Sequence, residues 1–401
     1  MKVVQINICS NGSTGNLAEL IHNRLISKGN ESYIFYSFGP DCKNGFFKIG
    51  NFFTRNIHYF FAKITGFYGY FSVIPTLSLI RKIKKISPDI IHLHNIHGAF
   101  INYPIFFRFL KKYKCHTVFT LHDCWLFTGK CPHFTAAGCY KWKEKCGGCP
   151  QLAEYPKSFF VDNTRLMLEN KKKWIGELEK VNFVTVSDWL KNTAQQSFLG
   201  KYPVSRIYNG IDSETFSPKN ADRVREKYKI NAEFIILGVA SVWDTRKGLR
   251  QFIELSNMLS EDEKIVLVGL NEEQKKALPS NIIAVSRTES RDELAEIYSC
   301  ADVFVNLSVE ETFGLTVAEA MACGTPVIVY NSTACPEIVN KDCGYAVTPN
   351  DINGVFEKIR EIRRKTKTYF SSFCRDNVLR NFTFDKMAGE YLELYRKNLE
   401  Q

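Results

Sequence analysis

The hydrophobic pattern of the chain begins as a strand, a glycine-bearing turn and a helix in direct succession. Apolar residues predominate at residues 2–9, the turn reads Asn-Gly-Ser-Thr-Gly-Asn at 11–16, and residues 17–27 place apolar side chains at helical spacing. A short apolar run bounded by turn residues favours a buried strand, and a following period near 3.6 favours an amphipathic helix. This opening predicts a β-α-β unit and therefore a parallel sheet.

The same alternation continues along the first half of the chain. Further strands are predicted at residues 33–38, 90–94, 117–121, 181–186 and 204–208. A helix is predicted at residues 188–198 with Ser187 as its N-cap, because a serine hydroxyl can accept from the unpaired amides of a first turn. The turn Asn209-Gly210-Ile211-Asp212 then indicates a domain junction.

After this turn the pattern restarts. Predicted strands at 234–240, 264–268, 282–285, 303–306 and 326–330 alternate with helices at 249–259, 292–300 and 355–365, and an amphipathic segment follows at 384–397. A chain of 401 residues exceeds the size at which one core keeps growing. We predict an α/β fold of two doubly wound, Rossmann-like domains facing a central cleft. They are a domain at 1–205 with a cysteine-rich insertion at 124–150, a domain at 206–383, and a helix at 384–401 that packs back on the first domain.

The richest candidate chemistry lies at residues 311–327, where two carboxylates flank a predicted helix start. Helix formers precede Gly324 and predict a short helix from Thr316, whose first amides carry a partial positive charge suited to a phosphate. Glu311 precedes the helix and Glu319 lies in its first turn, so the two acids can hold different parts of one ligand. As an alternative, Thr316 to Glu319 form a capping box in which Glu319 only closes the helix end.

The charge of the chain points to an anionic partner. The net charge is +11, and nucleic acid, a nucleotide-sugar and an acidic lipid surface all fit it. Residues 3–8 are too short for the hydrophobic region of a secretory signal, so we expect a cytoplasmic protein. Residues 64–80 are uncharged but contain Gly66, Gly69 and Pro75, which argues against a membrane span.

The aromatic residues around this segment leave two interpretations open. Phe52, Phe53, Tyr59, Phe60 and Phe61, with the basic runs at 81–85 and 111–114, can rest peripherally on the inner face of the cytoplasmic membrane. The alternative is a helical hairpin buried in the core, with the basic runs on solvated helix faces.

Several motifs together resemble a known enzyme family. They are the E-x7-E spacing of Glu311 and Glu319, the Glu-Ala-Met-Ala-Cys-Gly-Thr-Pro-Val that follows, the turn at 209–212 with Phe216 and Pro218, and Lys247-Gly248. In this combination the chain resembles retaining glycosyltransferases of family 4, which have the GT-B fold. Residues 91–98 and 121–131 are similar to the bacterial exopolysaccharide branch that includes colanic-acid enzymes.

The resemblance implies a donor site in the second domain. Glu319 would hold ribose hydroxyls, Glu311 the transferred sugar, and Lys247 with the amides of Phe313, Gly314 and Leu315 the diphosphate. This set supplies the positive charge that a metal ion supplies elsewhere. No D-x-D motif is present in the N-terminal half, so we expect metal-independent catalysis without a cofactor. The family's arginine position is Val242 here, and Arg246 is the candidate substitute.

The resemblance also implies a set of residues in the first domain. Gly15 and its loop would lie opposite the diphosphate, and His122, at the end of a strand, would lie beside the reacting sugar. His94, Asn95 and His97 would line the acceptor side. For each of these polar residues a plain internal hydrogen bond is the competing interpretation.

Five of the 13 cysteines lie between Cys124 and Cys149. Cys131, Cys139, Cys146 and Cys149 form C-x7-C-x6-C-x2-C, and the last pair has the spacing of a zinc knuckle. This predicts a structural zinc ion, with reduced buried thiols as the alternative.

The sequence thus predicts a hexosyltransferase that acts with retention. Its donor would be a nucleotide-diphosphate sugar, and its acceptor a saccharide, lipid-linked in the assembly of surface polysaccharide. One rival is a nucleotide-sugar epimerase or hydrolase on the same fold. The other is a nucleic-acid-binding protein that uses the basic face and the cysteine knuckle, although we expect no nucleic-acid partner because that role leaves the paired glutamates unused.

Overall fold

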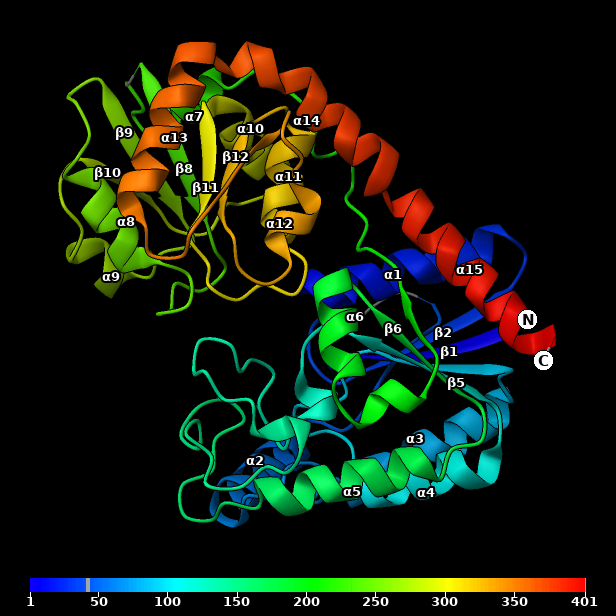
Figure 1. Ribbon diagram of the computed structural model, residues 1–401. Helices are drawn as coiled ribbons and strands as arrows, with labels where there is room; N and C mark the ends of the chain where they lie inside the picture. Colours follow the sequence, from blue (N-terminus) through cyan, green and yellow to red (C-terminus); the bar gives the residue numbers. More distant parts are fainter. Residues whose placement is uncertain (41–43, 232, 401) are drawn as a thin grey trace. The chain divides into compact units, whose positions relative to one another are not determined.

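The computed structural model describes residues 1–40, 44–231 and 233–400. It divides into two compact units, one formed by Met1–Tyr208 with Ala388–Gln401 and the other by Asn209–Met387. Each unit is built around its own parallel sheet with helices on both faces (Figure 1). The predicted α/β architecture of two Rossmann-like domains is therefore confirmed.

The first unit contains a seven-stranded parallel sheet in the order β3-β2-β1-β4-β5-β6-β7. Its strands are β1 (Lys2–Ile6), β2 (Glu31–Tyr36), β3 (Phe46–Lys48), β4 (Ile90–Leu93), β5 (His116–Leu121), β6 (Val181–Thr185) and β7 (Val204–Arg206). The register pairs Gln5 of β1 with His92 of β4 and continues to Ile6 with Leu93. Side chains alternate between the two faces of a strand, so Gln5 and His92 bring polar groups to the same part of the sheet.

Among the described residues, seven α-helices belong to this unit, the last of them from Ala388 onward. They are α1 (Gly12–Ser27), α2 (Phe52–Thr65), α3 (Val73–Ile86), α4 (Tyr103–Tyr113), α5 (Thr164–Gly176), α6 (Asp188–Gln195) and the C-terminal α15 (Phe384–Glu400). In Figure 1, α3, α4 and α5 lie on one face of the sheet and α1 on the other. The hydroxyl groups of Tyr391 and Tyr395 in α15 contact Thr120 and His92 of this unit at 2.9 and 2.6 Å.

The second unit contains a six-stranded parallel sheet in the order β10-β9-β8-β11-β12-β13. Its strands are β8 (Phe234–Val239), β9 (Glu263–Val268), β10 (Ile282–Val285), β11 (Val303–Asn306), β12 (Val327–Tyr330) and β13 (Gly344–Val347). Its helices are α7 (Asp222–Lys227), α8 (Leu249–Ser256), α9 (Glu272–Lys276), α10 (Arg291–Cys300), α11 (Leu315–Ala322), α12 (Cys335–Ile338), α13 (Ile352–Lys365) and α14 (Lys367–Asn381). Strands β8, β11 and β12 are buried almost throughout, which explains their continuous apolar sequences.

Most predicted elements lie where the hydrophobic pattern placed them. The strands at 282–285 and 303–306 are confirmed to the residue, and Ser187 caps α6 by accepting from the amide of Leu190 at 3.1 Å. The loop predicted at 11–16 is wrong, because α1 already begins at Gly12. Strands β3 and β13 and helices α5, α7, α9, α12 and α14 were not predicted.

Helix α2 contradicts the buried-hairpin interpretation, although the segment that follows it is partly buried, with Tyr68, Leu79 and Ile80 in the core. Only His58 and Ala62 of this helix are buried, whereas Phe53 is 75% exposed and Phe60 is 60% exposed. The aromatic side chains therefore face outward from an otherwise well-packed unit. In the part of the chain that the structure describes, every helix falls short of the length and apolarity that crossing a bilayer requires.

Candidate active site

Lys247 is positioned by a tight turn between β8 and α8. Gly248 has φ +79° and serves as the N-cap of α8, and a Cβ atom there would lie 2.6 Å from Cβ of Leu307. Only glycine tolerates both the left-handed backbone and this close approach. The amide of Val309 donates to the carbonyl oxygen of Arg246 at 3.0 Å, which fixes the turn beside the chain that leaves β11.

In the second unit, Lys247 and Glu311 form an ion pair. The ammonium group of Lys247 donates to Oε1 of Glu311, and the side chains are 24% and 17% exposed. The backbone of Glu311 is held on both sides, since its amide donates to Oγ1 of Thr333 at 2.9 Å and its carbonyl accepts from Ala334 at 3.2 Å. The structure thus brings together two of the residues predicted for the sugar and the diphosphate.

The tip of α11 follows Glu311 directly. Gly314 is the N-cap with φ +98°, no side chain caps the helix, and α11 begins at Leu315. The capping-box interpretation of Thr316 and Glu319 is therefore wrong, and the first amides of the helix depend on groups outside it. The helix stops before Gly324, which has φ +76°, as the sequence predicted.

Glu319 lies one turn into α11 and faces a neighbouring helix. Its Oε2 accepts from the hydroxyl of Tyr298 in α10 at 3.1 Å. Burial raises the pKa of Glu319 to about 7, and the Tyr298 hydrogen bond and the charge of Arg291 oppose that rise only in part. An acid with such a pKa can be protonated or ionised near neutral pH, and a hydroxyl-bearing ligand would favour the ionised form.

Arg246 is turned toward a different partner. Its Nη2 and Nε atoms donate to Oδ2 of Asp244 at 2.7 and 3.2 Å. The predicted donor-binding role of Arg246 stays a prediction, and it would require this pair to open.

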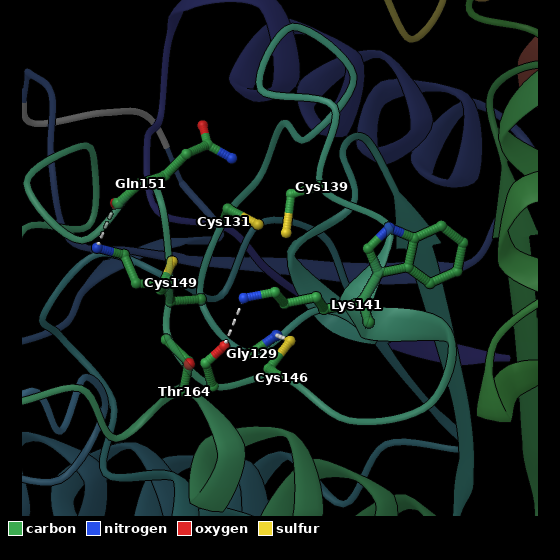
Figure 2. A pocket seen from close by; sticks show the side chains of 11 residues that line it. Gly129, Cys131, Cys139, Lys141, Cys146, Cys149, Gln151 and Thr164 are labelled. Carbon is green, nitrogen blue, oxygen red and sulfur yellow. Dashed lines mark hydrogen bonds between the residues drawn. The ribbon is translucent and has the colours of Figure 1, made fainter.

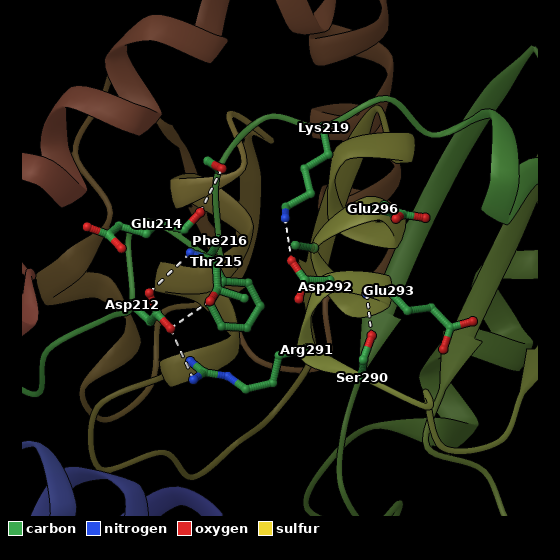
Figure 3. Close-up of polar contacts among 12 residues, drawn as sticks. Asp212, Glu214, Thr215, Phe216, Lys219, Ser290, Arg291, Asp292, Glu293 and Glu296 are labelled. Carbon is green, nitrogen blue, oxygen red and sulfur yellow. Dashed lines mark hydrogen bonds and ion pairs between the residues drawn. The ribbon is translucent and has the colours of Figure 1, made fainter.

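The turn at 209–212 supports the same region through Arg291. Asp212 accepts from the amide and hydroxyl of Thr215 at 3.1 and 2.7 Å, and its carboxylate pairs with Arg291 at 3.1 Å (Figure 3). The guanidinium lies 5.2 Å from the ring centroid of Phe216. The charge of Arg291 acts on Glu319. Asp212 therefore holds in place a cation that influences the carboxylate of α11.

In the first unit, a pocket at the ends of β4 and β5 gathers the predicted acceptor-side residues. His94, Asn95, His97 and His122 all line it, with Asp123 among the other lining residues. Nε2 of His97 lies 2.9 Å from Oδ2 of Asp123, and Nδ1 lies 3.0 Å from the hydroxyl of Tyr155. His94, Asn95 and His97, predicted for the acceptor side, thus line the same pocket as His122, which was predicted to lie beside the reacting sugar. Their roles stay predictions.

A chain of hydrogen bonds fixes the proton on His122. The side-chain amide of Gln5 donates to the carbonyl of Ala18 at 3.0 Å, so its Oε1 accepts from Nε2 of His94 at 3.0 Å. Nδ1 of His94 must then be the acceptor in its 3.0 Å contact with Nε2 of His122. Burial lowers the pKa of His122 to about 4, so the neutral ring carries its proton on Nε2.

Gln5 and Asn7 are site residues that sequence reasoning missed. Asn7 donates to Oγ1 of Thr14 at 3.1 Å, and its Oδ1 accepts from the amide of Asn95 at 3.2 Å. It thereby ties the start of α1 to the histidine pocket. Two polar residues at i and i+2 within an apolar strand were the signal that could have revealed them.

Gly15 lies in the first turn of α1. A Cβ atom there would stand 2.7 Å from the carbonyl carbon of Ser10, so only glycine lets α1 begin this close to the chain leaving β1.

The four predicted zinc ligands line one pocket. Cys131, Cys139, Cys146 and Cys149 surround it together with Lys141 (Figure 2). The amide of Gly129 donates to Sγ of Cys146 at 3.2 Å, and burial raises the pKa of Cys131 to about 12. Across residues 1–40, 44–231 and 233–400, no group of three or more histidine, cysteine or acidic side chains is placed to hold a metal ion. The thiols are neighbours that do not converge, and the zinc site stays a prediction.

Comparison with known families accounts for both units. The family description "Glycosyltransferase Family 4" matches residues 15–215, and "Glycosyl transferases group 1" matches residues 233–365. The chain belongs to glycosyltransferase family 4. This membership does not favour the nucleic-acid-binding or epimerase alternatives.

Curated relatives agree with this assignment. The chain is 25% identical over 380 residues to the putative colanic acid biosynthesis glycosyl transferase WcaC of Escherichia coli, covering 88% of each protein. It is 28% identical over 204 residues to an N,N'-diacetylbacillosaminyl-diphospho-undecaprenol alpha-1,3-N-acetylgalactosaminyltransferase of Campylobacter jejuni, covering 46% of this chain and 52% of that one.

Solved structures identify the fold as GT-B. A sucrose-phosphate synthase from Thermosynechococcus elongatus has a TM-score of 0.73 at 17% identity and covers 99% of this chain and 98% of its own. The Anabaena protein HepE, solved in complex with UDP-glucose, has a TM-score of 0.66 at 13% identity and covers 99% of this chain and 100% of its own.

Proposed function

We propose that this glycosyltransferase moves a hexosyl group from a nucleotide-diphosphate sugar to a saccharide acceptor with retention at the anomeric carbon. The observation that carries the proposal is the Lys247–Glu311 pair beside the uncapped tip of α11. A lysine and a helix N-terminus can stabilise the charge that develops on a departing diphosphate, and a carboxylate can hold sugar hydroxyls.

Each of the predicted residues takes a role in this proposal. In the second unit, Lys247, Arg246 and the backbone amides of residues 313–315 at the N-terminus of α11 would bind the diphosphate. Glu311 would contact the sugar and Glu319 the ribose. In the first unit, Gly15 would belong to the donor side. The neutral ring of His122 would contact the transferred sugar, and His94, Asn95 and His97 would position the acceptor. Catalysis would require no metal ion at the donor site, so turnover should not depend on added divalent cations.

The proposed biological acceptor is a lipid-linked saccharide in surface polysaccharide assembly. The names of the E. coli and Campylobacter relatives support this, since one concerns colanic acid biosynthesis and the other a diphospho-undecaprenol sugar. The enzyme would then work at the inner face of the cytoplasmic membrane as a peripheral protein.

A donor panel and one variant test the proposal. UDP-, GDP-, ADP- and dTDP-sugars are compared by thermal shift, because a ligand that binds only the folded state raises the melting temperature. The donor that binds is incubated with and without acceptor, and NMR reads the anomeric configuration of the product. Glu311→Gln should lower kcat at least about hundredfold with little change in melting temperature. An unchanged rate, or free sugar formed equally well without acceptor, would refute the proposal.

We further propose that Cys131, Cys139, Cys146 and Cys149 bind a structural zinc ion. The C-x2-C spacing and the common pocket support it, and coordination would draw the thiols inward to about 2.3 Å from the metal. Metal analysis of the purified chain should give one zinc per molecule. The double variant Cys146→Ser with Cys149→Ser should contain none and should exchange amide hydrogens faster at 124–150. A zinc-free, fully active wild-type enzyme would end this proposal.

A further inference from the structure

Helix α2 presents an apolar face to solvent. Its buried residues, His58 and Ala62, are four positions apart and mark the inner side. The outer side carries exposed apolar side chains, namely Phe52, Phe53, Ile57, Phe60, Phe61 and Ile64. Residues at i, i+3, i+4 and i+7 share one helix face, so these side chains form a continuous stripe. An ordinary surface helix has this arrangement reversed, with its apolar stripe turned to the core.

A second segment extends the stripe at the end of α2. The amide of Phe159 donates to the carbonyl of Lys63 at 2.8 Å, and the side-chain amide of Asn163 donates to the carbonyl of Thr65 at 2.7 Å. These bonds hold residues 159–161 beside the helix, and Phe160 there is 79% exposed. We call the outer face of α2 together with Phe159, Phe160 and Val161 the aromatic patch. Contiguous apolar surface of this kind marks an interaction site.

The charge around the aromatic patch favours an anionic partner. Arg55 and Lys63 are the ionisable residues of α2 other than His58 and Tyr59, and neither is acidic. The wider stretch from residue 44 to residue 122 holds 12 lysines and arginines and a single acid, Asp89. The ammonium of Lys63 lies 5.9 Å from the ring centroid of Phe159, so one cation sits directly at the patch. Asp162 directly follows the 159–161 segment, whereas α2 itself carries cations and no acid. Aromatic side chains with an excess of cations around them match an anionic lipid surface.

We propose that the aromatic patch docks this enzyme on an anionic bilayer, with the phenyl rings at the boundary between headgroups and acyl chains. A second copy of the chain would place cations against cations, which disfavours it as the occupant. This inference deepens the proposed peripheral location by assigning it to named residues, and it does not depend on the identity of the donor.

The same segment connects the patch to the histidine pocket. Tyr155, four residues before Phe159, contacts Nδ1 of His97 through its hydroxyl at 3.0 Å. The pocket that would position the acceptor and the surface that would meet the lipid are therefore joined by one short stretch of chain. A saccharide on a lipid anchor could be presented from the bilayer along this path, and this last step rests on the proposed function.

Vesicle co-sedimentation tests the docking surface. The wild-type chain should pellet with vesicles of phosphatidylcholine and phosphatidylglycerol, and less with phosphatidylcholine alone. The double variant Phe53→Ser with Phe60→Ser should bind at least about tenfold more weakly, because two apolar side chains no longer insert. Arg55→Gln with Lys63→Gln should weaken binding to anionic vesicles by roughly fivefold per charge and leave binding to neutral vesicles unchanged. The matched control is Phe373→Ser, an exposed phenylalanine of the second unit.

The outcomes separate the alternatives. The substituted phenylalanines are exposed and Arg55 and Lys63 are partly exposed, so the melting temperature should stay within a few degrees of wild type. A wild-type chain that does not pellet with anionic vesicles overturns the proposal without any variant. Equal binding by Phe53→Ser/Phe60→Ser and Phe373→Ser also overturns it, as does a concentration-dependent dimer that only the first variant abolishes. Turnover of a water-soluble acceptor is measured in parallel, so failure to dock and failure to transfer sugar remain distinguishable.

Discussion

The pKa of Glu319 makes donor binding depend on pH in a defined direction. If the ribose hydroxyls are held by the ionised carboxylate, only the ionised fraction of the free enzyme is competent. With a pKa of about 7, that fraction is roughly one tenth at pH 6 and nine tenths at pH 8. The apparent Kd for the donor should therefore rise about tenfold from pH 8 to pH 6. The diphosphate bridge of a nucleotide-sugar has no proton to lose in this range and adds no pH dependence of its own.

Calorimetric titration at pH 6, 7 and 8 measures this effect, and Glu319→Gln is the control. The variant should bind the donor more weakly at pH 8 and should show no trend with pH. A wild-type Kd that stays constant between pH 6 and pH 8 would refute the assignment of Glu319 to a ligand hydroxyl.

A second measurement checks the pKa independently of any ligand. Burial raises the pKa from an ordinary 4.5 to about 7, so ionising Glu319 in the folded protein costs roughly 3 kcal/mol. The folded state keeps a proton that the unfolded state releases, hence stability falls as pH rises from about 4.5 to about 7. The glutamine of Glu319→Gln does not titrate. The free energy of unfolding of this variant, relative to that of wild type, should therefore increase as pH rises across this range. If the free energies of unfolding of the two proteins change in parallel with pH, the pKa of Glu319 is not raised.

Three further variants test the supports of the site. Gly248→Ala should destabilise the second unit by roughly 1–2 kcal/mol because residue 248 has a left-handed backbone, and the clash of the new Cβ with Leu307 should add to this. A variant as stable in urea as wild type would contradict the turn geometry. Gln5→Leu should leave Nε2–H of His94 buried without a hydrogen-bond partner, which lowers the free energy of unfolding by roughly 1–3 kcal/mol. Nitrogen NMR should then show a changed tautomer of His94, and an unchanged histidine spectrum would disprove the chain of hydrogen bonds. Lys171 is buried, and its Nζ donates to three backbone carbonyls of residues 125–129. Lys171→Met should lower the melting temperature of the first unit by about 3 °C or more, and an unaltered melting curve would contradict this supporting role.

The tip of α11 was predictable because its chemistry is local. Glu311, Gly314 and Glu319 lie within nine residues, and the helix formers and Gly324 that set its limits are adjacent. The start of α1 was not, since the glycine- and serine-rich turn has a loop composition. There a long-range contact decides: Asn7 of the preceding segment binds Thr14, and Gly15 allows the close approach to Ser10.

Long-range partners explain the other omissions. Gln5 and His94 are separated by 89 positions, and the parallel pairing of β1 with β4 brings them together. The aromatic residues of α2 were open to two interpretations because periodicity identifies an apolar face without saying what covers it. The sequence spacing of the four cysteines likewise placed them in one pocket but did not determine how closely their sulfur atoms approach.

The paired charges of the second unit bear on which anions the site would accept. Lys247 is bound to Glu311 and Arg246 to Asp244, so each cation already has a carboxylate partner. A bare phosphate that took Lys247 would leave Glu311 half-buried without its cation, which is costly. A nucleotide-sugar offers hydroxyl groups to the displaced carboxylate at the same moment as its diphosphate reaches the lysine. Replacing the Lys247–Glu311 ion pair by these two contacts therefore favours a ligand that carries both a diphosphate and sugar hydroxyls. It disfavours nucleic acid, because the phosphates of its backbone have no hydroxyl-rich sugar beside them.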